Sequence, residues 1–262
     1  MAELRKAAPG GWLRDRPYIK YIAPAMLTLF VLSIIPTLFL VIVSFTDYQL
    51  GWSPDRAEFV AFENYMRLFS GRDRDFWHAV YISLVFMIAA TSVEMVLGFA
   101  IALLLNEKEF RLKPLVVGIL IIPLAMTPTI AGQMWKLMFN AEYGLLNYLL
   151  GGLFGLKVPW LSSGMAFWSI MIVDIWQFTP FVALILYSGL RSLPDEPYES
   201  AMIDGAGKAR SFYYVTLPMM RPLILLAMLM RAVDSLKLFD TAFVLTQGGP
   251  GNATEFLSLH VF

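Results

Sequence analysis

The sequence predicts an all-α fold, a polytopic transmembrane helix bundle. Apolar residues make up 58% of the chain and charged residues 15%, whereas soluble domains average about 45–50% and about 25%. Mean hydropathy is +0.64. A chain of 262 residues with this much apolar surface cannot enclose it in a water-facing globule, so lipid should solvate much of it.

The number of spans follows from the apolar segments. Five segments are each near the ~20 apolar residues that cross ~30 Å of hydrocarbon. They are Ile22–Phe45, Val80–Leu105, Leu115–Phe139, Met165–Leu190 and Leu223–Leu245. A sixth apolar segment begins at Phe256, where the sequence is about to end. We therefore predict a single transmembrane domain over residues 1–262, with five full spans, the start of a sixth and no separate soluble domain.

The distribution of Lys and Arg predicts the orientation. Twelve of these residues fall on one side of the predicted spans and five on the other. The richer side includes the head (residues 1–20) and the connection 191–221, so both should be cytoplasmic. Since no small-residue cleavage site follows the first span, we expect it to be a retained anchor in the cell membrane.

The remaining connections differ in character. The loop 46–77 is rich in aromatic side chains among charges and fits either an amphipathic helix on the bilayer surface or a plain ordered loop. The loop 140–164 carries five glycines and should hold only short helical turns. Pro123, Pro128 and Pro180 lie inside predicted spans and should bend them.

The stretch "ESAMIDGAGKARSFYYVTLP" (199–218) is polar and glycine-broken between two apolar spans. Asp195 can cap a helix that has Pro197 in its first turn and ends at Gly205 in a left-handed conformation. A second short helix should run to about Thr216, after which Pro218 turns the chain toward the next span. The result is two short helices with an elbow of small residues. The alternative is a re-entry turn that lies on the lipid headgroups.

This stretch resembles the EAA loop of ABC-importer permeases. The matching positions are Glu199, Ala201, Asp204, Gly205, Ala206, Phe212, Val215, Leu217 and Pro218, and Ser200 is a mild departure. Further segments, among them "WQFTPFVALILYSGLRSLPDEPYESA" and "FDTAFVLTQGGPGNATEFLSL", look like carbohydrate-uptake permeases of the maltose, trehalose and glycerol-3-phosphate type. The resemblance implies the fold of a type I ABC-importer permease.

The same resemblance implies the partners of the chain. It implies a heterodimer with a second permease, two cytoplasmic ATPase subunits and an external solute-binding protein that delivers a sugar. The loop would be the coupling helix that docks on an ATPase, through Glu199, Ala201, Asp204, Gly205, Ala206, Phe212, Leu217 and Pro218. The chain has no P-loop, so we expect no cofactor in it, with ATP and Mg bound by the partner ATPase.

Charged residues inside the spans are costly and often functional. Arg231, Asp234, Lys237 and Asp240 follow one another at intervals of three in the fifth span. They form either a self-neutralised ladder that faces other subunits or a stripe that partly faces water. In the fourth span, Asp174, Gln177 and Phe181 share one face. We expect Glu94 to hydrogen-bond within the bundle and Lys136 to reach the interface.

In the maltose-type permeases the sugar is held midway through the membrane. Matching this sequence to that family through landmark motifs implies substrate contacts at Asp174, Gln177, Phe181, Ser235 and Leu238, with Arg231 beside them. Carboxylate and amide acceptors with an aromatic ring suit a sugar. The alternative for Asp174 is a salt bridge to Arg231 or Lys237. Trehalose, maltose, another glycoside or a polyol phosphate would all be compatible.

Three classes of function compete. A permease of an ATP-driven sugar importer is the leading hypothesis, with no catalytic residue in this chain. An intramembrane enzyme would need a nucleophile or a metal cluster, but the sequence has no cysteine, no HExxH and no GxSxG, and its two histidines are far apart. An ion-driven carrier would have no use for an EAA loop. A net charge of zero argues against nucleic acid as a partner.

Overall fold

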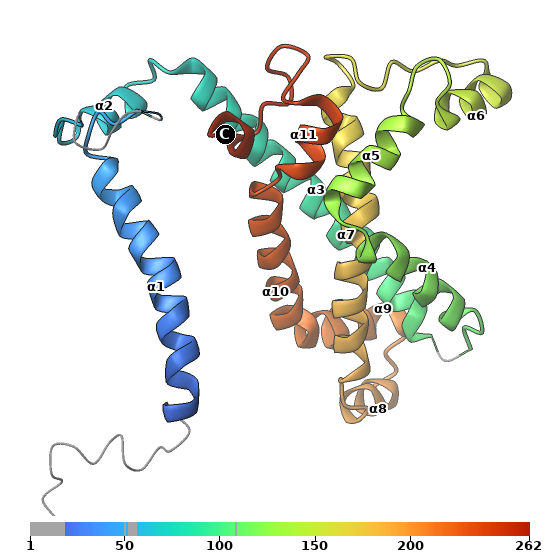
Figure 1. The fold of residues 1–262 in the computed structure, drawn as a ribbon. Helices are drawn as coiled ribbons and strands as arrows, with labels where there is room; N and C mark the ends of the chain where they lie inside the picture. Colours follow the sequence, from blue (N-terminus) through green and yellow to red (C-terminus); the bar gives the residue numbers. More distant parts are fainter. Residues whose placement is uncertain (1–18, 50, 52–56, 108) are drawn as a thin grey trace, which may run out of the picture. The chain divides into compact units, whose positions relative to one another are not determined.

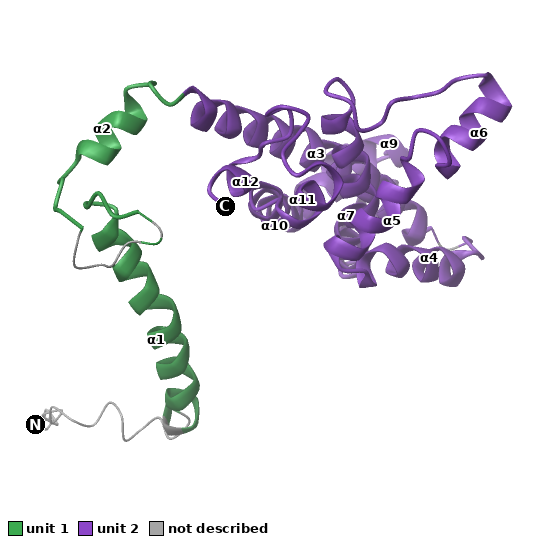
Figure 2. Cartoon of the chain, turned by 45° about the horizontal axis from the view of Figure 1, so that its top comes forward, with its two compact units in different colours: residues 1–73 green, residues 74–262 purple. Residues whose placement is uncertain are grey.

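The computed structural model describes residues 19–49, 51, 57–107 and 109–262. The predicted cytoplasmic head, apart from its last two residues, lies outside the described residues. The described part is all-helical, as predicted, with one isolated bridge between Thr46 and Phe59. The chain divides into two compact units, Met1–Asp73 and Arg74–Phe262 (Figure 2). The prediction of a single domain over residues 1–262 stays a prediction.

Figure 1 shows the helices in chain order. Unit 1 holds α1 (Ile19–Val43) and α2 (Glu63–Phe69), and unit 2 holds α3 (Arg74–Asn106), α4 (Lys113–Ala125), α5 (Pro128–Met138), α6 (Leu145–Phe154), α7 (Ala166–Arg191), α8 (Glu196–Ile203), α9 (Lys208–Ser211), α10 (Leu217–Leu236), α11 (Asp240–Thr246) and α12 (Leu257–His260). A π turn, Phe212–Thr216, joins α9 to α10. In this described part, four helical stretches are long and apolar enough to cross a membrane, or five if the bent pair α4–α5 is one span.

Unit 1 is an exposed apolar helix anchored at its end by a small aromatic cluster. Every described side chain from 21 to 42 is exposed within the unit, which suits a helix that faces lipid or another subunit. Beyond α1, Phe45 packs its ring against Phe62 and Tyr65. The side-chain amide of Asn64 donates to the carbonyls of Ser44 and Thr46. The loop 46–77 therefore contains a short helix, α2, held to the end of α1.

The core of unit 2 is the packing of α3, α7 and α10. α3 packs against α7 more extensively than any other pair of helices does, and Figure 1 shows the two helices crossing. They approach closely at Gly98, where an added Cβ would lie 2.7 Å from Val182 Cγ1 and 3.1 Å from the Ala183 backbone nitrogen. α7 approaches α10 in the same way at Gly189, where an added Cβ would overlap the side chain of Leu223. Small residues allow such approach between helices in lipid.

The predicted third span is a bent pair. α4 and α5 meet at 99° across Met126 and Thr127, so the predicted bend in Leu115–Phe139 is confirmed, and a single span over these residues stays a prediction. Pro128 has no N–H and stands at the start of α5, where that donor is not needed. The Thr127 hydroxyl caps α5 by accepting from the Ile130 N–H. The proline signal located the bend correctly, but the chain turns there far more sharply than at a kink.

The predicted fifth span, Leu223–Leu245, has the wrong limits at both ends. The helical stretch begins earlier, at Lys208, and ends at Leu236, after which α11 starts at Asp240. Pro218 lies in the first turn of α10, and the helical stretch is continuous from the π turn into this helix. At the other end, the N–H groups of Lys237 and Leu238 bond three residues back and tighten the last turn. This turns Leu238 into the buried core.

The other limits agree with the sequence to within six residues. The predicted spans Ile22–Phe45, Val80–Leu105 and Met165–Leu190 correspond to α1, α3 and α7. α7 continues through Pro180 as one helix of 26 residues. The loop 140–164 contains only the ten-residue α6, as its glycines predicted, and the sixth apolar segment begins as the short α12.

The close approach at Gly98 gives a test of this packing. Gly98→Ala should lower the free energy of unfolding by about 1–3 kcal/mol, because the methyl group must displace the Val182 side chain and crowd the α7 backbone. Gly118→Ala is the matched control, since nothing lies within 4 Å of its added Cβ. Thermal unfolding of the two variants in detergent, followed by circular dichroism, compares them. Equal midpoints would contradict the packing described here.

Candidate functional site

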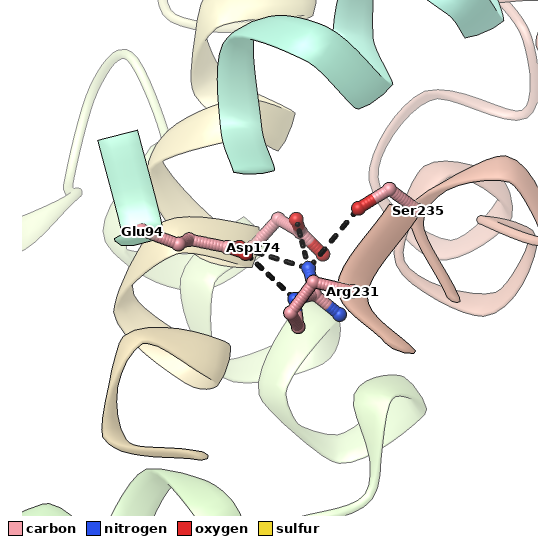
Figure 3. Close-up of polar contacts among 4 residues, drawn as sticks. All are labelled: Glu94, Asp174, Arg231 and Ser235. Atoms are coloured by element: carbon pink, nitrogen blue, oxygen red, sulfur yellow. Dashed lines mark hydrogen bonds and ion pairs between the residues drawn. The ribbon is translucent and has the colours of Figure 1, made fainter. Parts of the chain in front are cut away.

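A buried ion cluster joins the three central helices. Figure 3 shows Arg231 of α10 between Glu94 of α3 and Asp174 of α7. The guanidinium donates twice to Glu94, with Nε 2.6 Å from Oε2 and Nη2 2.8 Å from Oε1. Nη2 also lies 2.9 Å from Asp174 Oδ2 and 3.2 Å from Ser235 Oγ. We call Glu94, Asp174 and Arg231 the buried triad.

The triad is shielded from solvent. Arg231 and Asp174 are each 1% exposed and Glu94 is fully buried. The ring of Phe178 covers the guanidinium, with the Arg231 Cζ 4.1 Å from its centroid, a favourable place for a cation. Three charged groups in an apolar bundle are tolerated only when they satisfy one another. The geometry meets this condition, because each carboxylate accepts at least one charge-assisted hydrogen bond.

The four charged residues at intervals of three do not form a ladder. Arg231 turns inward to α3 and α7, while Asp234, Lys237 and Asp240 are exposed. The helix ends at Leu236, so Asp240 belongs to α11. The ladder interpretation is therefore wrong. The salt bridge that was the alternative for Asp174 is confirmed, and Arg231 is its partner.

The other predicted substrate residues lie around the triad without forming one surface. Gln177 donates from Nε2 to the carbonyl of Met126, at the break between α4 and α5, over 2.9 Å. Its amide oxygen is buried and lacks a hydrogen-bond partner among the described residues. Phe181 packs on a buried apolar cluster that contains Val182 and Met220, which we call the inner cluster. Leu238 is buried in a second apolar cluster, which contains Phe139 and Phe256. The hydroxyl of Ser258 donates to the carbonyl of Leu238.

Glu94 is the residue that the sequence did not assign to the site. Its expected role, a hydrogen bond within the bundle, is confirmed. It lies 137 residues from Arg231 in the chain, so no local spacing predicts the pair. The available signal was a glutamate in the middle of an apolar helix. Lys136 donates to the carbonyl of Val244, 2.8 Å away, and thereby links α5 to α11.

The EAA-like loop forms the predicted elbow. α8 ends at Ile203, and Gly205 has φ +74°, the left-handed conformation expected of it. The N–H of Gly205 bonds to the carbonyl of Met202, and the N–H of Ala206 to that of Ala201. These two hydrogen bonds form a Schellman motif at the end of the helix. Asp195 makes no side-chain cap, so that part of the prediction is wrong.

The loop residues that the resemblance singled out differ in exposure. Phe212 is half-buried against Phe99 of α3, with ring centroids 5.6 Å apart. Ala201 and Ala206 are half-buried, and both line a hollow of about 640 Å³ between the arms of the elbow. The exposed members are Glu199, Asp204, Gly205, Leu217 and Pro218. On the outer side of the elbow, Met202 is 65% exposed and Ile203 is 87% exposed.

The turn Thr246–Pro250, which follows α11, has a defined geometry. Gln247 and Gly248 both have positive φ. The Thr254 hydroxyl donates to the carbonyl of Gly249 over 2.8 Å and lies 2.7 Å from the hydroxyl of Thr246. The turn contacts α3 where the His78 ring lies 3.2 Å from the carbonyl of Asn252.

Comparison with known proteins decides the family. Residues 94–258 match the family described as binding-protein-dependent transport system inner membrane component. The chain belongs to this family. The matched region contains the whole buried triad and the elbow. Membership makes the chain a permease of a transport system, as the sequence predicted.

Among the similar proteins are two that are named after a carbohydrate substrate. The trehalose/maltose transport system permease protein MalF of Thermococcus litoralis is 40% identical over 205 residues, which are 78% of this chain and 68% of that protein. The sulfoquinovosyl glycerol transport system permease protein SmoG of Agrobacterium fabrum is 34% identical over 241 residues, 92% of this chain and 77% of that protein.

A solved structure has the same fold. The chain is similar to a bacterial ABC transporter involved in the import of the acidic polysaccharide alginate, with a TM-score of 0.78 and 17% identity over 95% of this chain and 84% of that one. A second structure, of a bacterial alginate ABC transporter in complex with an alginate pentasaccharide-bound periplasmic protein, has a TM-score of 0.73. At this identity the likeness shows the fold of an ABC-importer permease.

The triad gives a prediction about stability. Arg231→Met should lower the free energy of unfolding by about 3–5 kcal/mol, because two buried carboxylates lose the cation that both contact. Asp174→Asn should cost less, about 1–3 kcal/mol, since the two bonds between Arg231 and Glu94 remain. Asp234→Asn, on the same helix but exposed, is the control. Thermal unfolding of detergent-purified protein ranks the three. An Arg231→Met variant as stable as the control would contradict the role of the triad.

Proposed function

We propose that this chain is one of two permease subunits of an ATP-driven sugar importer in the cell membrane. Its partners would be a second, different permease, two ATPase subunits and an external binding protein that delivers the sugar. The N-terminus and the elbow would be cytoplasmic, as the basic residues predict. ATP and Mg would bind to the ATPases and not to this chain. The observation that carries the proposal is the elbow at Gly205, in a member of a binding-protein-dependent transport family.

The form of the elbow supports its role as the ATPase contact. Large apolar side chains at the tip of a polar loop are unfavourable in water unless a partner covers them. Met202 and Ile203 are such side chains, exposed on the outer side of α8. Glu199 and Asp204 provide charge beside them. We assign ATPase coupling to Glu199, Ala201, Asp204, Gly205, Ala206, Phe212, Leu217 and Pro218.

A sugar as substrate is supported by the relatives and by the polar groups inside the bundle. Both relatives have names that state a carbohydrate or its glycoside. Inside unit 2, the unpartnered amide oxygen of Gln177 is an acceptor that a sugar hydroxyl could satisfy. We assign substrate contact to Asp174, Gln177, Phe181, Arg231, Ser235 and Leu238. In the conformation described here, Arg231 and Asp174 are occupied with each other, so a sugar would have to rearrange the triad or contact the groups beside it.

The experiment is uptake by the reconstituted complex. The chain, its partner permease, the ATPase subunits and the binding protein are combined in liposomes. The probes are trehalose, maltose, sulfoquinovosyl glycerol and an alginate oligosaccharide. We expect one of these sugars, delivered by the binding protein, to stimulate ATP hydrolysis and to be taken up. A complex that hydrolyses ATP but takes up none of the four would contradict sugar import.

Gly205→Val tests the elbow in the same assay. A β-branched side chain at φ +74° costs about 1–3 kcal/mol of backbone strain, so the elbow should lose its shape. We expect uptake to fall by about tenfold or more while the complex still assembles, because nothing lies within 4 Å of a Cβ added at Gly205. Gly207→Ala is the matched control, because its φ of −71° suits an L-residue. Normal uptake by Gly205→Val would contradict the assignment of the elbow.

A further inference from the structure

One hydrogen bond ties the elbow to the helix that follows it. The hydroxyl of Tyr198, on α8, lies 2.9 Å from the hydroxyl of Thr216, the last residue of the π turn. Thr216 is 7% exposed and Tyr198 is half-buried. Since few waters can compete for a hydroxyl pair in such a place, the bond should persist. Among the described residues it is the one side-chain hydrogen bond between α8 and the 208–236 helical stretch.

The π turn holds Thr216 in an unusual position. The N–H of Leu217 bonds to the carbonyl of Phe212, five residues back, so the turn is wider than an α-helical turn. Such single turns cost stability and often occur at functional sites. The turn also contacts α3, because the ring of Phe212 packs on Phe99. The π turn therefore lies between the elbow on one side and α3 on the other.

The start of α10 is packed too tightly to move alone. Met220, one turn beyond Thr216, is fully buried in the inner cluster. At Gly189 of α7, an added Cβ would overlap Leu223 and lie 3.0 Å from Met220 Cε. Packed interiors transmit displacement because they have no space to absorb it. A displacement of Thr216 must therefore displace α10 and, through it, α7.

We propose that Tyr198 and Thr216 are positioning residues that transmit movement of α8 to α10. Their hydrogen bond makes α8 and the start of α10 one rigid piece, so a push on the elbow moves α10 and does not merely bend the loop. Neither hydroxyl is needed to touch an ATPase or a substrate. The inference rests on the proposed function, because it presupposes that α8 receives a force from a partner subunit.

Other hydroxyls near the elbow do not offer such a link. The hydroxyl of Ser200 donates to the carbonyl of Glu196 within α8 itself. Tyr213 and Tyr214 are 63% and 77% exposed. Tyr198 is therefore the hydroxyl of α8 that reaches the next helix in the described structure.

The test is a double-mutant cycle in the reconstituted complex. Tyr198→Phe and Thr216→Val each remove one hydroxyl and keep the size of the side chain. Each should lower the sugar taken up per ATP hydrolysed by about two- to tenfold, as expected for one lost hydrogen bond. The double variant should be no worse than either single one, because both remove the same bond. Thr216→Ser should restore coupling, and Tyr81→Phe, which removes an exposed phenol hydroxyl on α3, should behave as wild type.

A second measurement does not require the sugar to be known. The sequence has no cysteine, so spin labels can be placed at Glu196 of α8 and Met230 of α10, both exposed, with the cysteines of the partner subunits replaced. Pulsed electron paramagnetic resonance on the assembled complex should give one narrow distance distribution, with and without ATP. In Tyr198→Phe and Thr216→Val the distribution should broaden, because α8 is no longer fixed to α10.

The outcomes separate this inference from the proposed function. If the wild-type complex takes up sugar, and both single variants show normal coupling and narrow distances, the proposed role of the Tyr198–Thr216 bond is overturned and the proposed function is not. Losses that multiply in the double variant would also overturn it, because the two residues would then act separately. Reduced assembly with an unchanged ratio of uptake to hydrolysis would show a purely structural role. A wild-type complex that neither takes up sugar nor retains the narrow distance would overturn both proposals.

Discussion

The guanidinium of Arg231, held between two carboxylates in an apolar bundle, is the constraint on which unit 2 depends. Charges that leave water are stable only if they satisfy one another. The three that do so here come from three different helices, Glu94 from α3, Asp174 from α7 and Arg231 from α10. Because a hydrophobic driving force between helices is weak in lipid, such a cluster fixes which helices are neighbours. It also fixes their register, since each distance is near 3 Å.

Packing on the elbow side of the triad continues the same three-helix body. Gly98 brings α3 against α7, and Gly189 brings α7 against α10. The elbow is attached to this body at Thr216 and at Phe212, and not only through its own chain ends. The bent pair α4–α5 is attached through Gln177, which satisfies the carbonyl that the break at Met126 would leave free. One rigid core with a polar elbow at one end is what an importer driven by separate ATPases would need.

The sequence predicted those features that are set locally. Apolar length placed α1, α3 and α7, and the left-handed Gly205 followed from the need of a helix end for a residue without Cβ. Features that depend on distant partners were missed. The interval of three between Arg231 and Asp234 favoured a local pair, but a buried Arg231 gains more from Glu94, 137 residues away, than from an exposed neighbour. The ends of α10 were missed for the same reason. The π turn and the turn at Leu238 follow from packing against other helices.

The most direct test of the three-helix core is amide hydrogen exchange of the protein in lipid nanodiscs, compared between wild type and Asp174→Asn. The substitution is on α7 and weakens one of the three hydrogen bonds that Arg231 makes with the other members of the triad. If the triad holds α3, α7 and α10 as one body, exchange should rise around Glu94 and Arg231 as well as around position 174. A rise confined to α7, with α3 and α10 unchanged, would contradict the account.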